Sequence, residues 1–135
     1  MAGNSEYVQL ALTNWFRGTA MPTAPASLEL ALSTVSLSDD GSNIAEPAGL
    51  DGYARQAVTL TAPVHTENAG SLVSNSNAII FPVVVNNSWG TIVAAAVFDT
   101  VSGEMLFEGD LVAPRNGPVG DTLSFGVGTL QFVVR

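Results

Sequence analysis

The segment SLELALS, residues 27–33, decides the fold class of this 135-residue chain. Its leucines, Leu28, Leu30 and Leu32, alternate with smaller or charged residues, and a period of two is typical of a half-buried β-strand. Upstream of this segment the apolar period is 3.6, and downstream the chain continues as short apolar runs separated by turn residues. We therefore expect a fold built mainly from strands.

The other expected strands are short, have apolar residues at alternate positions or throughout, and end at Gly, Pro, Asn or Asp. They cover residues 53–61, 72–74, 78–85, 91–99, 105–113, 122–125 and 129–134. The run at 91–99 is apolar almost throughout, so both of its faces should be covered. This pattern predicts an antiparallel β-sandwich or barrel, jelly-roll-like, with seven or eight strands.

One short N-terminal α-helix is expected over residues 5–17, because apolar side chains from Val8 to Trp15 recur on one helix face. Pro22 and Pro25 then predict an extended arm, since proline lacks the amide donor and restricts the residue before it. We expect a single domain over residues 1–135, with the helix at 5–17, the Pro-containing arm at 19–27 and the β-sandwich at 28–135.

The composition excludes several classes of partner. With twelve acidic residues, four arginines and a net charge of -8, the chain lacks the clustered cations that bind nucleic acid. Its most apolar stretches are too short to cross a bilayer as a helix, so we expect no membrane partner. Only 12% of the residues are charged, which is low for a free globular surface and indicates contact with neighbouring proteins.

No catalytic, cofactor or metal site is expected. The chain has no cysteine, and its one histidine, His65, lies in a polar stretch without a recognisable nucleophile motif. Asp39, Asp40, Ser42 and Asn43 could offer oxygen ligands to calcium, but their spacing fails the EF-hand pattern and also suits Asx turns. We therefore expect a protein that is not an enzyme.

Several ordered motifs resemble a family of small virion proteins of tailed bacteriophages, commonly labelled tail fibre proteins. The motifs are WFRGT at 15–19, GYARQAV at 52–58, SNSNAIIFP at 74–82, WGT at 89–91, FD at 98–99, SG at 102–103 and GDTLSF at 120–125. The chain departs from the family at Asn77, where alanine is frequent, and at the more apolar segment 93–96. The resemblance implies a structural role in the virion and synthesis in the bacterial host cytoplasm.

Physical arguments favour the head over the tail for this role. The chain has no heptads or repeats for a fibre shaft, and a low charge count suits a surface that is buried against capsid protein. We therefore expect a capsid decoration (cement) protein that bridges and stabilises major capsid subunits. A tail or tail-fibre-base component is the alternative, and a glycan-binding module is the second alternative. The expected partner is the major capsid protein or else tail proteins, in a homo-oligomer or other symmetric assembly.

Exposed aromatic and arginine side chains are the natural anchors of such an interface. Trp89 is ambiguous, because it could cap the core or bind a neighbour. The residues expected at the assembly interface are Trp15, Phe16, Arg17, Met21, Pro22, Tyr53, Arg55 and Trp89. The helix and arm could alternatively close one sheet of the sandwich.

Overall fold

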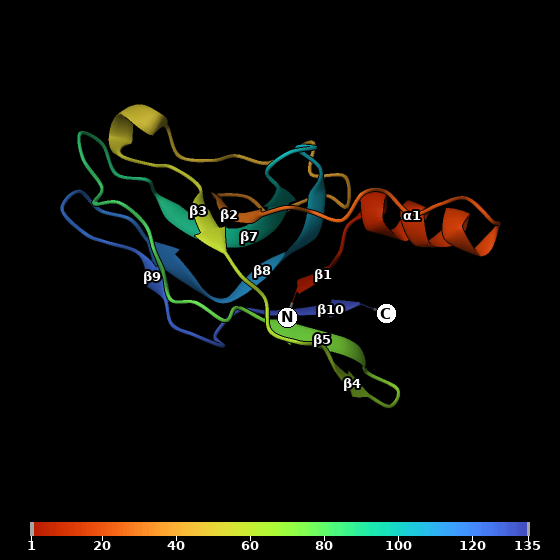
Figure 1. Cartoon of the computed structure of the whole chain (residues 1–135). Helices are drawn as coiled ribbons and strands as arrows, with labels where there is room; N and C mark the ends of the chain where they lie inside the picture. Colours follow the sequence, from red (N-terminus) through yellow and green to blue (C-terminus); the bar gives the residue numbers. More distant parts are fainter. Residues whose placement is uncertain (1, 135) are drawn as a thin grey trace.

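The alternating leucine segment forms strand β2 (Leu28–Ser33), which pairs with strands on both sides. The computed structural model describes residues 2–134 and is mainly β, with one α-helix near the N-terminus (Figure 1). An eight-stranded sheet has the order β3-β2-β7-β8-β1-β10-β5-β4, and a second sheet contains only β6 and β9. The remaining strands are β1 (Ala2–Asn4), β3 (Gln56–Val58), β4 (Val64–Thr66), β5 (Gly70–Ser74), β6 (Ile79–Ile80), β7 (Thr91–Asp99), β8 (Met105–Asn116), β9 (Ser124–Phe125) and β10 (Gln131–Val134).

The large sheet is curled, and a single segment of the chain supplies the strands at both of its ends. Strands β3 and β4 lie at opposite ends of the strand order, yet both belong to the continuous segment 56–66. Between them, Leu60 forms an isolated bridge with Asn75, and the Thr61 amide donates to the Ser74 carbonyl at 2.8 Å. One segment therefore joins β2 to β5, and the sheet takes the shape of a half-barrel (Figure 1).

The concave side of this sheet encloses the main core. Buried side chains from β2, β7 and β10 meet Phe81, Val84 and Trp89 there. A smaller cluster lies on the outer face of β2 and β7, where Phe98 and Met105 pack with Leu37 and Ile44. The expectation that both faces of segment 91–99 are covered is therefore confirmed.

The helix α1 (Glu6–Phe16) is confirmed within one residue of its predicted bounds. Ser5 is its N-cap: the Ser5 hydroxyl oxygen accepts from the Val8 amide at 3.3 Å, and the hydroxyl donates to the Met105 carbonyl. No residue of α1 is buried, and the helix extends away from the sheet (Figure 1). It closes no sheet, so that alternative role is wrong.

The expectation of a mainly β fold with one helix is confirmed, but the finer architecture differs. In the described residues, ten strands form one curled mixed sheet and one two-stranded sheet, and the β1–β10 pair is parallel. The apolar period reports which face of a strand is buried, and it does not report how a sheet bends. In segment 78–85 only Ile79 and Ile80 pair as a strand, because Pro82 lacks a donor and the following residues form a loop.

Candidate functional site

The Asp39–Asn43 loop is organised by turns. Asp40 Oδ1 accepts from the Ser38 hydroxyl at 2.7 Å and from the Ser42 amide at 3.0 Å, which is the Asx-turn interpretation. The hydrogen bond from Ser38, followed by those from Ser42, lowers the pKa of Asp40 to about 2. Among residues 2–134, no three His, Asp or Glu side chains are grouped so that they could hold a metal ion. No helix in the same part of the chain is long and apolar enough to cross a membrane.

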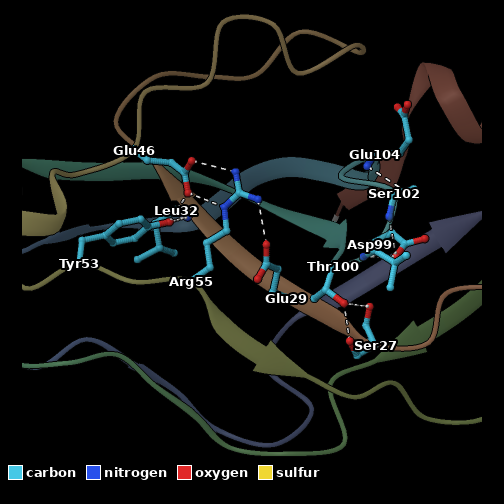
Figure 2. Close-up of polar contacts among 11 residues, drawn as sticks. Ser27, Glu29, Leu32, Glu46, Tyr53, Arg55, Asp99, Thr100, Ser102 and Glu104 are labelled. Atoms are coloured by element: carbon cyan, nitrogen blue, oxygen red, sulfur yellow. Dashed lines mark hydrogen bonds and ion pairs between the residues drawn. The ribbon is translucent and has the colours of Figure 1, made fainter.

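Arg55 lies at the centre of a polar cluster on the outer face of the sheet (Figure 2). Its Nε and Nη2 donate to the two carboxylate oxygens of Glu46, each at 2.9 Å, and its Nη1 donates to Glu29 at 3.0 Å. Its guanidinium carbon also lies 4.0 Å from the centroid of the Phe98 ring. Arg55 thus ties the long loop that contains Glu46 to strand β2, through the bidentate pair with Glu46 and the single hydrogen bond to Glu29.

Tyr53 completes this cluster. Its hydroxyl donates to Glu46 at 2.6 Å and accepts from the Leu32 amide at 3.0 Å (Figure 2). Burial, followed by the hydrogen bond to Glu46, raises the pKa of Tyr53. Burial also tends to raise the pKa of Glu46, but the hydrogen bonds from Arg55 and Tyr53 outweigh it and hold that pKa below its usual range. Tyr53 and Arg55, two of the expected interface residues, therefore brace the fold.

Trp89 lies inside the curled sheet and is only 4% exposed. Its indole Nε1 donates to the Asp51 carbonyl at 2.9 Å, and the rings of Tyr53 and Phe81 pack edge-on against it at 5.5 and 6.3 Å. A Cβ at Gly117 would lie 2.9 Å from the Trp89 Cβ, so this position accommodates only glycine without a shift. Of the two roles expected for Trp89, the core role is confirmed.

Asn75 is a structural residue that the sequence did not single out. Its side chain is fully buried, and its amide donates to the carbonyls of Asn77 and Gly126 at 2.8 and 2.9 Å. Its Oδ1 accepts from the Leu130 amide at 3.0 Å. Asn75 thus joins the end of β5 to the segment that enters β10. Asparagine is typical of turns, so its type gave no sign of burial.

The remaining expected interface residues are all exposed. Trp15 and Phe16 are 55% and 75% exposed, and their ring centroids are 5.5 Å apart. We call Trp15, Phe16 and Arg17 the helix tip. Met21 and Pro22 follow on the exposed arm. Residues 7–28 contain one charged side chain, Arg17, so this surface is almost free of charge.

A second surface feature, which the sequence did not reveal, is a slot between β8 and β10. Strand β1 separates these two strands only near Gly3, which pairs with Glu108 on one side and Val133 on the other. Beyond β1, strands β8 and β10 form the sides of a cavity of about 240 Å³, which we call the β8–β10 slot. Its lining residues are Ala95, Gly109, Asp110, Leu111, Val112, Ala113, Arg115, Phe125, Thr129, Leu130, Gln131 and Phe132. The slot arises because a three-residue strand lies beside one of twelve residues, and sequence periodicity does not report pairing.

Comparison with known proteins adds one match. Residues 3–133 match the family described as Podophage GP4 fiber I protein gp80, and this span includes the helix, the arm and the whole β8–β10 slot. No curated protein matches the chain.

Proposed function

This chain belongs to the Podophage GP4 fiber I protein gp80 family, and on that premise we propose that it is a non-enzymatic structural component of a podophage tail fibre. The family match over residues 3–133 is the observation that carries this proposal. It favours the tail alternative and does not support the capsid cement role, so we place the protein on the tail of the virion with other tail proteins as partners. We also propose that the chain acts as a single domain.

The helix tip is the proposed contact with a neighbouring subunit of the virion. Trp15 and Phe16 offer two large rings to a partner, and such aromatic side chains contribute most strongly where an interface excludes water. The surface around them is nearly free of charge, so a partner can cover it without desolvating acids of this -8 chain. Arg17, Met21 and Pro22 extend the same surface, whereas Tyr53, Arg55 and Trp89 support the fold that carries it.

A glycan-binding function is weaker in this structure. A ring that stacks on a sugar must be exposed, and the Trp89 ring is buried beneath Tyr53 and Phe81. We therefore keep the structural role as the single proposal.

The test replaces the exposed rings of Trp15 and Phe16 and measures how much of this chain is incorporated into phage tails. Phages carrying Trp15→Ala with Phe16→Ala should assemble tails that contain less of this chain, because the anchor side chains are lost. Leu50→Ala is the matched control, since Leu50 is 84% exposed and lies far along the chain on the short 3-10 helix Gly49–Asp51. Both variants should unfold at the wild-type temperature. Wild-type amounts of the double variant in purified tails would contradict the proposal.

A further inference from the structure

The β8–β10 slot suits a ligand in which an apolar group lies next to a positive charge, because apolar walls and acidic side chains are found together there. Its walls are formed mainly by apolar side chains from β8, β9 and β10, including Leu111, Phe125 and Phe132. Asp110 lines the slot and is exposed, and Glu108 lies two residues earlier on the same strand. Because side chains alternate along a strand, these two acids share one face of β8.

The acids beside the slot have no basic partner within residues 2–134, where both ion pairs involve Arg55. Burial, followed by repulsion from Asp39 and Asp110, raises the pKa of Glu108. Arg115 also lines the slot, but its Nη1 already donates to the Ser124 carbonyl at 2.8 Å and its guanidinium lies 4.8 Å from the Phe125 ring centroid. An incoming cation would therefore reduce repulsion among carboxylates.

The slot is large enough for an aromatic ring. A dry cavity of about 150 Å³ in another protein holds benzene, and the β8–β10 slot measures about 240 Å³. Val112 stands at the slot with 97% of its surface exposed, so the apolar lining continues to the molecular surface. The slot is therefore accessible from the surface at Val112.

The helix tip has the complementary chemistry. Phe16 and Trp15 are exposed rings, and the next residue is Arg17. The Arg17 side chain donates to Asn14 at 3.3 Å and has no acidic partner in the described part of the chain. Of the other described arginines, Arg55 is held by two carboxylates and Arg115 by Ser124.

The helix tip cannot enter the slot of its own chain. The Ser5 amide donates to the Leu106 carbonyl at 2.8 Å, so α1 starts at the beginning of β8. From that point the helix extends away from the sheet (Figure 1). The slot lies further along β8, beyond residue 108. Any contact between the two surfaces therefore joins two molecules.

We propose that the helix tip of one copy occupies the β8–β10 slot of a second copy, with the ring of Phe16 against the apolar walls and Arg17 beside Asp110. Such a contact is heterologous, so it links copies head to tail into a ring or an open chain. This contact between copies does not depend on where the protein lies in the virion.

A charge-exchange experiment on the purified chain tests this contact. Arg17→Asp and Asp110→Arg each place like charges together, and each should weaken self-association at least tenfold in sedimentation velocity at low salt. An equimolar mixture of the two variants should restore association, because every tip then meets a slot of opposite charge. Both positions are exposed, so thermal unfolding should show intact folds, and Glu67→Arg serves as an exposed charge-reversal control.

The outcomes separate the possible contacts. Loss of association in each variant and recovery in the mixture would support the proposal. Three results would overturn it: a wild-type chain that stays monomeric at every concentration, an Asp110→Arg variant that associates like the wild type, or a mixture that does not recover. A contact between two helix tips would produce the second of these results, because it does not involve Asp110.

Discussion

At the scale of single residues, a few buried polar side chains determine how the sheet closes. The side-chain amide and the Oδ1 of Asn75 all have protein partners, and its bonds to Gly126 and Leu130 join segments more than fifty residues apart. On the outer face of the sheet, Arg55 likewise joins distant segments through its ion pairs with Glu46 and Glu29. Neither role could be predicted from the sequence. Asparagine is typical of turns and arginine of surfaces, and only tertiary contacts determine where such a residue is buried.

Asn75→Asp should destabilise the protein in a pH-dependent way. At pH 7 the introduced carboxylate would face two carbonyl oxygens, and we expect a loss of about 2–4 kcal/mol in the free energy of unfolding. Burial would raise the pKa of this carboxyl above its unfolded value of about 3.9. The loss should therefore be small below that pH and grow as the pH rises through the folded pKa. Urea unfolding of the wild type and the variant at pH 3.5 and pH 7 measures this loss in the free energy of unfolding. An equal loss at the two pH values would contradict the assigned hydrogen bonds.

Arg55→Ala should lower the free energy of unfolding by about 1–3 kcal/mol. This range lies between the values for exposed and buried ion pairs, because the ion pairs of Arg55 with Glu46 and Glu29 are partly buried. Arg55→Lys is the matched control: it keeps the charge but loses the bidentate geometry, so it should recover only part of the loss. Chemical unfolding at pH 7 gives both values. Two variants as stable as the wild type would show that this cluster does not hold the loop.

The same cluster predicts an acid-sensitive contribution to stability. The pKa of Glu46 is lower in the folded protein than in the unfolded chain, so its contribution is present above about pH 4.3 and is lost as the pH falls through the folded value. Between pH 6 and pH 3, Glu46→Gln should therefore lose less stability than the wild type. Parallel loss in both proteins would contradict this assignment.

At the scale of elements, local signals predicted α1 well and the strand pairing poorly. The 3.6 period, the Ser5 cap and Gly18, which has φ 96°, are all local, and they set the helix bounds within one residue. Strand β1 has the sequence AGN, which has no apolar period, and it becomes a strand only because β8 and β10 lie on either side. The β8–β10 slot depends on this pairing, so it could not be predicted either.

Ser5→Ala should loosen the attachment of α1 to the sheet. The Ser5 side chain is buried, caps the helix at Val8 and donates to the Met105 carbonyl. We expect a loss of about 1–2 kcal/mol and weaker helical circular dichroism at 222 nm, as for other N-cap serines. Thr13→Ala, an exposed change on the same helix, is the control and should not destabilise the protein. Equal effects of the two changes would argue against the anchoring role of Ser5.

At the scale of the whole molecule, composition indicated contact with neighbours but could not identify them. The low charge count agrees with a nearly uncharged helix and arm that lie away from the core (Figure 1). The same count suits a capsid interface and a tail interface equally, because both bury uncharged surface. The low charge count alone therefore could not support the expectation of a capsid cement protein over a tail component. The family match favours the tail.

The location of the chain in purified virions tests the central claim most directly. Heads and tails can be separated and the copies of this chain in each fraction counted by quantitative mass spectrometry. A tail fibre component should copurify with tails in a small number of copies that matches the tail symmetry, and should be missing from tail-free heads. Hundreds of copies on tail-free heads, with none on isolated tails, would contradict the account.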